Sequence, residues 1–382
     1  MRVVIAPQAL KGSLTAKEAG MAIAKGVANV FLHAQVDIIP IADGGEGTVQ
    51  ALVDATEGEL IWQEVTGPLG EPVQAYWGLM GDGRTAVIEM AASSGLPLVP
   101  HELRDPRITT TYGVGELIRA ALDRGCRHFI IGLGGSATND GGAGMAQALG
   151  ASLMDAGGEQ IAPGGAVLLS LAHIAVEHLD ARLHECTFDV ACDVTNPLCG
   201  PLGASAIYGP QKGATPAMVE ELDHALVHYA EVIQRDVQMA VADIPGAGAA
   251  GGLGAGTITF LRGNLRPGAQ IVNEALRVAE RIAQADLVIT AEGQLDVQTA
   301  YGKSVGAVAE IARAHAIPTL ALAGSLGENY QAVYALGIAA VAVLPSGPMT
   351  LTYAMQNAAD LLMDATERTC RAIKLGIDMR PT

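Results

Sequence analysis

Short apolar runs alternate with longer amphipathic stretches along most of the chain. Strand-like segments, most of them continuous apolar runs, recur at residues 2–6, 36–40, 127–132, 187–192, 286–290, 318–323 and 338–344. Apolar runs without alternating polar positions are typical of parallel strands that are covered on both faces. Helical patterns follow most of these runs, and strands that alternate with helices indicate βαβ units. We therefore predict an α/β fold with mostly parallel sheets.

The segment 59–90 departs from this rhythm. Three strand-like stretches, ELIWQEV, PVQAYWGLM and RTAVIEM, follow one another there, separated by glycine-containing turns. This pattern predicts an antiparallel meander. The simplest organisation is a Rossmann-like or flavodoxin-like domain made of residues 1–60 plus 270–382. A second, mixed α/β domain, 61–269, is then inserted into it.

Charge and cysteine content narrow the class of protein. The 382 residues include 23 Lys or Arg and 40 Asp or Glu, a formal net charge of −17. Such a chain repels nucleic-acid phosphates and is unsuited to a cationic role at a membrane surface. The five cysteines form no C-x-x-C pair, which disfavours a zinc ribbon and a disulfide framework. We expect a cytoplasmic protein with small-molecule substrates, no nucleic-acid partner and no membrane partner; a homodimer stays open.

Many of the 47 glycines stand where predicted strands give way to helices. Ligands of open α/β sheets bind at these carboxyl ends, and glycine lets the backbone approach a ligand closely. The segment 41–48, IADGGEGT, adds the carboxylates of Asp43 and Glu46. A plain turn with helix-favouring acids is the alternative interpretation. The tract at 245–256 is equally compatible with a lid and with a linker.

The segment 132–142, GLGGSATNDGG, follows a predicted strand, so its amides and hydroxyls are placed to cradle phosphate. The pattern Gly132-x-Gly134-x-x-Ala137 also matches a dinucleotide-binding fingerprint, with Asp155 near the expected ribose partner. The next helix is expected only near Asp140, which argues against standard dinucleotide-binding geometry.

Acidic residues mark two further turns. Asp193 and Asn196 follow the strand at 187–192, where they can hold Mg²⁺ or orient a hydroxyl; an Asx turn is the alternative. Glu292 and Asp296, in the turn expected after 286–290, are spaced to share a cation. Lys303 lies at a helix start and can meet phosphate, although the glycine that a P-loop needs is missing.

Taken together, these segments resemble the bacterial type-1 glycerate kinases. The similar motifs, in family order, are IADGGEGT (41–48), IEMAASSGL (88–96), RDP…TTTYGVGELI (104–118), GLGGSATNDGGAGM (132–145), ACDVTNPL (191–198), GPQKGA (209–214), PGAGAAGGLGAG (245–256) and EGxxDxQTxxGK (292–303). Two positions differ from the family pattern. Gln8 and Ala9 stand where the family usually has Asp-Ser, and Ala291 stands where it usually has Gly.

The resemblance implies an ATP-dependent transferase that phosphorylates D-glycerate with Mg²⁺, in the cytoplasm. Such enzymes usually yield 2-phosphoglycerate, in glyoxylate or aldarate metabolism. The resemblance also implies two α/β domains, one of them flavodoxin-like, with the active site between them.

Residue type and position then suggest roles for this reaction. Asp193 is the candidate general base, with Asp43 second, and Glu292 and Asp296 are candidate Mg²⁺ ligands. Lys11, Lys212 and Lys303 are expected to neutralise phosphate. The full candidate nucleotide set is Gly134, Gly135, Ser136, Thr138, Asn139, Lys212 and Lys303. The glycerate carboxylate would meet Lys11 or Arg104, and the other candidate substrate contacts are Asn196, Glu46 and Thr111.

Two other classes of function stay open at this point. One is an NAD-dependent oxidoreductase of 2-hydroxy acids that uses the fingerprint at 132–137. The other is a metabolite-binding homologue without catalysis, suggested by the departures at Gln8 and Ala291. The first predicts an absorbance change of the nicotinamide, and the second predicts ligand-induced stabilisation without ATP turnover.

The role given to Lys303 is testable by one substitution. We expect Lys303→Ala to weaken the binding of MgATP, because the variant loses a positive charge expected beside the phosphates. Steady-state kinetics with varied ATP would measure this as a raised KM. Unchanged KM and kcat for ATP would place the phosphate site elsewhere.

Overall fold

The computed structural model describes residues 1–296, 299 and 304–379, and the chain forms two compact units. Unit 1 comprises Met1–Asp43, Gln50–Thr56 and Val272–Thr382; unit 2 comprises Gly44–Val49 and Glu57–Ile271. We propose that these units correspond to the two domains expected from the sequence. In the part of the chain described, no helix is long and apolar enough to cross a bilayer.

Unit 1 is built on a five-stranded parallel sheet in the order β13-β12-β11-β1-β2. Its strands are β1 (Arg2–Pro7), β2 (Gln35–Ile38), β11 (Leu287–Leu295), β12 (Thr319–Leu326) and β13 (Ile338–Val343). The parallel strands predicted from the apolar runs of unit 1 are therefore confirmed.

The end of β11 was predicted wrongly. The strand does not stop at 290, because Gln294 and Leu295 continue to pair with Ser325 and Leu326 of β12. Backbone pairing with a neighbouring strand outweighs the polar character of these residues. As a result Glu292 lies on a strand, and only Asp296 lies in the turn that follows.

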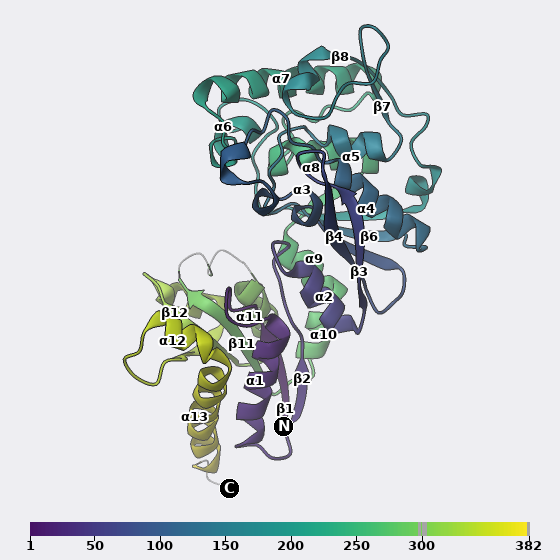
Figure 1. Cartoon of the computed structure of the whole chain (residues 1–382). Helices are drawn as coiled ribbons and strands as arrows, with labels where there is room; N and C mark the ends of the chain where they lie inside the picture. Colours follow the sequence, from purple (N-terminus) through teal and green to yellow (C-terminus); the bar gives the residue numbers. More distant parts are fainter. Residues whose placement is uncertain (297–298, 300–303, 380–382) are drawn as a thin grey trace. The chain divides into compact units, whose positions relative to one another are not determined.

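Helices cover this sheet. They are α1 (Ala16–Ala28), α2 (Thr48–Thr56), α9 (Gly268–Ala275), α10 (Val278–Ile282), α11 (Ser304–Ala314), α12 (Leu351–Gln356) and α13 (Ala358–Asp378), and α2 and α9 each also hold residues of unit 2. A capping box starts α1: the Glu18 N–H donates to Thr15 Oγ1 at 3.2 Å, and the Thr15 N–H donates to Glu18 Oε2 at 2.9 Å. Helices α1 and α13 pack side by side (Figure 1). Gly26 permits this approach, because a Cβ there would overlap Thr366 and the Met363 carbonyl.

Unit 2 contains a six-stranded mixed sheet in the order β10-β9-β6-β5-β4-β3. Its strands are β3 (Glu59–Thr66), β4 (Pro72–Leu79), β5 (Thr85–Glu89), β6 (His128–Gly132), β9 (Thr187–Ala191) and β10 (Asn264–Arg266). The predicted meander is confirmed, since β4 pairs antiparallel with β3 and with β5. The remaining pairs are parallel. A separate hairpin joins β7 (Ser152–Asp155) and β8 (Leu171–Ala175), and neither it nor β10 was foreseen.

The helices of unit 2 surround this sheet and the loops at its carboxyl edge. They are α3 (Ala91–Ser94), α4 (Tyr112–Asp123), α5 (Ala143–Ala148), α6 (Ala204–Tyr208), α7 (Pro216–Asp236) and α8 (Ala249–Leu261). The glycine tract at 245–256 lies largely in α8 and is almost wholly buried, so it is neither a linker nor a lid. At Gly251 the backbone has a φ of +69°, and a Cβ would overlap the Thr138 carbonyl oxygen. Only glycine allows α8 to approach the 132–142 loop this closely.

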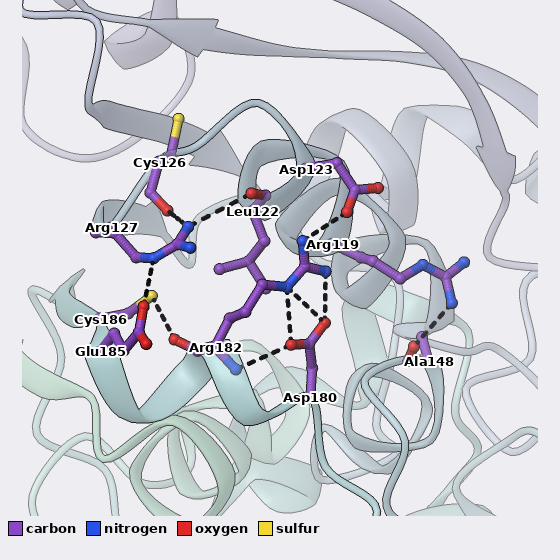
Figure 2. A network of polar contacts seen from close by, with 10 residues as sticks. All are labelled: Arg119, Leu122, Asp123, Cys126, Arg127, Ala148, Asp180, Arg182, Glu185 and Cys186. Carbon is purple, nitrogen blue, oxygen red and sulfur yellow. Dashed lines mark hydrogen bonds and ion pairs between the residues drawn. The ribbon is translucent and has the colours of Figure 1, made fainter.

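An ion-pair network holds the amino-terminal side of the β6–β9 region (Figure 2). Arg182 binds Asp180 at 2.6 Å and Asp123 at 2.7 Å, which ties the one-turn helix 181–185 to the end of α4. Arg127 donates to Glu185 at 3.1 Å and to the carbonyl of Cys126 at 2.8 Å. The network lies before the strands begin, so it supports the scaffold at the edge opposite the glycine-rich loops.

The core of unit 2 allows a direct stability test. Phe129 of β6 stacks on Phe188 of β9, with ring centroids 4.7 Å apart, in a core that includes the buried Trp77. Phe129→Ala should lower the free energy of unfolding of this unit by about 3–5 kcal/mol, because it leaves a cavity. Urea unfolding followed by tryptophan emission would report it. The exposed Ile108→Ala is the control, and equal effects of the two substitutions would contradict this packing.

Candidate functional site

The carboxyl edge of the unit 1 sheet borders a cavity of about 590 Å³. The loops after β1 and β13 and the ends of β11 and β12 line it, as expected for a ligand site in an open parallel sheet. Its polar lining residues are Gln8, Lys11, Ser13, Asp43, Glu292, Gln294, Asp296, Thr299 and Ser325. The structure thus brings together four residues singled out from the sequence: Lys11, Asp43, Glu292 and Asp296.

Thr299 connects the two acids that were predicted to share a cation. Its hydroxyl donates to Glu292 Oε2 at 3.1 Å and accepts the Asp296 N–H at 3.3 Å. Its own N–H lies 3.4 Å from Asp296 Oδ1. Residues 297, 298 and 300–303, including Lys303, lie outside the described part of the chain, so its predicted phosphate contact has no structural counterpart here.

Gln8 contacts the third acid of this cavity. Its Nε2 donates to Asp43 Oδ2 at 3.4 Å, at the position where the family pattern has a carboxylate. Within the described residues no three His, Cys, Asp or Glu side chains are grouped as metal ligands would be. The carboxylate oxygens are nevertheless the donors that Mg²⁺ prefers, and Mg²⁺ usually completes its shell with water and substrate phosphate. The donor chemistry therefore fits this ion.

The unit 2 sheet carries a second group of candidate residues at its own carboxyl edge. Glu89, Gly132 and Ala191 end three adjacent strands in register. Asp193 follows Ala191 and is exposed; its Oδ1 accepts the N–H of Gly268 at the start of α9, at 2.9 Å. This bond orients the carboxylate predicted as general base.

Glu89 anchors the 44–48 segment and was not singled out from the sequence. It is buried and accepts the Val49 N–H at 2.9 Å, and the N–H groups of Gly47 and Thr48 also face it. Burial raises the pKa of Glu89, and the nearby carboxylate of Glu46 raises it further. In the sequence, Glu89 could have been identified as an acid at the end of an otherwise apolar strand, TAVIE. Glu46 itself is exposed at this edge.

Only part of the 132–142 loop is accessible. Gly134 and Gly135 are exposed, whereas the segment 136–142 is buried. Asn139 Nδ2 donates to Ser205 Oγ at 2.9 Å. The buried atoms Thr138 Oγ1 and Asn139 Oδ1 have no hydrogen-bond partner in the described part of the chain. The backbone of Gly134 and Gly135 is therefore the part of this loop that a ligand can reach.

Asp140 is the buried centre of this loop and was also missed. Its carboxylate accepts the N–H and the hydroxyl of Thr111 at 2.8 and 2.9 Å, and the N–H groups of Gly142 and Gly144 at 3.2 Å. Burial raises the pKa of Asp140, although these donors oppose the shift. Thr111, predicted to contact substrate, thus has its hydroxyl inside the protein.

Lys212 lies beneath the same loop with only 1 % of its surface exposed. Its Nζ donates to the Thr138 carbonyl at 2.6 Å. Burial lowers the pKa of Lys212 to about 7, and the carboxylate of Asp140 opposes this shift. The structure gives Lys212 a supporting contact with the loop; contact with phosphate stays a prediction.

The other candidates occupy turns of unit 2. Asn196 donates to the Leu202 carbonyl at 2.8 Å and accepts the Tyr208 hydroxyl at 2.7 Å, so it holds its own turn together. Arg104 is half-buried, and its Nε has no hydrogen-bond partner among the residues that the structure describes. Its carbonyl lies against Gly213, next to Lys212.

The dinucleotide fingerprint does not have the geometry that NAD binding needs. Helix α5 starts only at Ala143 and has six residues, so it does not begin within the fingerprint. Asp155 ends β7, and its Oδ1 accepts the N–H groups of Gly157 and Glu159 at 2.8 and 3.1 Å. The expected ribose partner is instead part of a tight turn.

The buried Lys212 predicts how stability depends on pH. Because its folded pKa lies below that of an exposed lysine, the unfolded chain binds more protons from about pH 7 to 10, and stability rises with pH in that window. Wild type should therefore gain stability relative to Lys212→Met between pH 6.5 and 9. Urea titrations at both values measure this difference, with the exposed Lys17→Met as control. A constant or falling difference would contradict a depressed pKa.

Comparison with known proteins identifies the family. The family model described as "Glycerate kinase family" matches residues 3–374. A glycerate kinase of Bacillus subtilis (strain 168) is 51% identical over 382 residues, covering 100% of this chain and 99% of the relative. A glycerate 2-kinase of Escherichia coli (strain K12) is 50% identical over 377 residues, covering 99% of each. A solved structure from Salmonella typhimurium LT2, described as a presumed glycerate kinase 2, has a TM-score of 0.93 at 50% identity, covering 99% of this chain and 100% of that one. The chain belongs to the glycerate kinase family.

Proposed function

We propose that this protein catalyses the ATP-dependent phosphorylation of D-glycerate, giving 2-phosphoglycerate and ADP. The observation that carries the proposal is identity of about half of all positions with glycerate kinases over essentially the full length of both chains. The relative from Escherichia coli is named a 2-kinase, which supports the choice of hydroxyl. No observation favours the oxidoreductase or a purely binding role.

The reaction depends on charge neutralisation and positioning, because phosphoryl transfer needs little covalent chemistry from the protein. With a net charge of −17, the chain as a whole cannot attract a triphosphate, so local groups must hold it. Among the described residues, Lys11 is the lysine that lines the unit 1 cavity, and Lys303 is proposed to act beside it. Glu292 and Asp296 would hold Mg²⁺, which would neutralise phosphate charge. The exposed backbone of Gly134 and Gly135 is proposed as a further phosphate contact.

Asp193 is proposed to take the proton from the attacking hydroxyl of glycerate, with Asp43 as the second candidate. Asp193 is exposed, and the Gly268 N–H bound to its Oδ1 keeps the carboxylate oriented. Lys11 or Arg104 would pair with the carboxylate of glycerate, and Glu46 offers an acceptor for a substrate hydroxyl. Thr111 and Asn196 would act by holding their loops, given the internal hydrogen bonds that both make.

We propose the cytoplasm as the location of this reaction. All five cysteines are free in the structure, including Cys126 and Cys370, which are buried. Free thiols persist in a reducing compartment.

A coupled ADP-release assay with D-glycerate, ATP and Mg²⁺ tests the activity directly. We expect turnover that requires all three, with a product whose phosphorus NMR signal matches 2-phosphoglycerate. Turnover of NAD in place of ATP, or stabilisation by glycerate without ADP release, would overturn the proposal.

The role of Asp193 has its own test. Asp193→Asn should lower kcat by about 10²–10⁴-fold, the usual contribution of a general base, because the amide accepts no proton. The exposed Asp243→Asn in the same unit is the matched control and should leave kcat unchanged. A loss smaller than about tenfold in Asp193→Asn would exclude it as the base and direct attention to Asp43.

A further inference from the structure

The unit 1 cavity has an apolar wall that the roles assigned so far leave unused. Helix α12 and the first turn of α13 provide this wall, together with the loop that follows β13. Its apolar members are Leu344, Pro345, Leu351, Ala354, Met355, Ala358 and Leu361. Leu351 is 75 % exposed. Bare apolar side chains next to polar groups are typical of small-molecule pockets.

The floor of the same cavity contains a gap over one glycine. Gly293 lies inside strand β11, where glycine weakens a strand and often marks the close approach of a ligand or of another backbone. Among the described residues, no atom lies within 4 Å of where its Cβ would stand, so the backbone of those residues does not explain the glycine. Gly293 nevertheless lines the cavity. The open space over it therefore suits a ligand.

The loop after β1 contacts the apolar wall through a hydrogen bond and a methyl group. Ser13 Oγ donates to the Met355 carbonyl at 2.7 Å, and the Met355 methyl group lies against Gly12. Lys11 is next to these contacts in the same loop. A ligand that lies along α12 in this cavity therefore shares it with Lys11, Glu292 and Asp296.

Size and charge distinguish between the two substrates. A cavity of about 590 Å³ falls within the ~300–1,000 Å³ typical of pockets for drug-sized molecules, whereas glycerate is a three-carbon acid. Three carboxylates, Asp43, Glu292 and Asp296, face the cavity beside a single lysine among the described residues. They repel a small anion that brings no cation, but they suit a nucleotide that arrives with Mg²⁺.

From these observations we infer that the α12–α13 wall and the gap over Gly293 form the binding site for the nucleoside end of ATP. The base packs on Leu351, Ala354 and Met355. The phosphates extend toward Lys11, Glu292 and Asp296. This inference rests on the proposed function, since it names where the nucleotide of that reaction is bound. The residues proposed to contact glycerate in unit 2 are not part of this site.

Gly293→Val is the decisive variant. Valine favours β-strands, and none of the described atoms lies within 4 Å of a Cβ at this position, so the fold should be retained while the side chain fills the gap. We expect the Kd of MgADP, measured by calorimetry on the full chain, to rise at least tenfold. The KM of D-glycerate should stay within about twofold. Gly347→Val is the matched control: a Cβ there also has none of the described atoms within 4 Å, but Gly347 does not line the cavity.

A second pair of variants tests the wall. Ala354→Trp fills the cavity from α12, whereas Tyr353→Trp adds bulk at the neighbouring, exposed position outside the cavity. Only Ala354→Trp should weaken the binding of MgADP. Adenosine alone should compete with MgADP in wild type, because the site is assigned to the nucleoside. Thermal melts show whether each variant is folded.

The outcomes separate this inference from the proposed function. If wild type phosphorylates glycerate while Gly293→Val and Ala354→Trp, both folded, bind MgADP normally, the nucleoside lies elsewhere and the inference is wrong. Displacement of MgADP by D-glycerate would also overturn it, because the cavity would then belong to the acid. If Gly293→Val and Ala354→Trp lose MgADP binding as expected but wild type phosphorylates no glycerate, the nucleotide site is supported and the proposed function is wrong.

Discussion

The buried carboxylate of Asp140 is the constraint on which the glycine-rich half of the molecule depends. Removing such a group from water is costly unless donors surround it, and Thr111, Gly142 and Gly144 supply those donors. Lys212 adds a second buried polar group that binds the same loop. These contacts determine the course of residues 132–142 and leave Gly134 and Gly135 at the surface. The accessible backbone is thus presented by a network of buried groups.

Glycine serves two different purposes in this chain. At Gly251 and Gly44 a side chain would overlap neighbouring groups, Thr138 in one case and Ala191 in the other, so these glycines allow segments of unit 2 to pack closely. At Gly293 none of the described atoms lies within 4 Å of where a Cβ would stand, and a cavity lies beside it. A sequence motif does not distinguish the two cases, although only the second leaves room for a ligand.

The acidic character of the chain shapes its chemistry. A protein with a net charge of −17 gains solubility but must bind anions through a few local groups. In unit 1 the acids Glu292 and Asp296 share contacts with Thr299 and stand beside Lys11 at one cavity. A divalent cation with its phosphates suits such a site better than a bare anion does.

The sequence by itself determined the fold class, the parallel strands, the meander and the family, because apolar periodicity and ordered motifs are local signals. It also singled out Lys11, Asp43, Glu292 and Asp296, which line one cavity at the edge of the unit 1 sheet. Tertiary structure decided which polar groups are buried: Thr111, Thr138 and Lys212 look like ligand-binding residues in the sequence but lie inside the protein. Burial, the extension of β11 through pairing with β12, and the apolar wall of α12 all depend on contacts between residues far apart in the chain. Local sequence carries no record of such contacts.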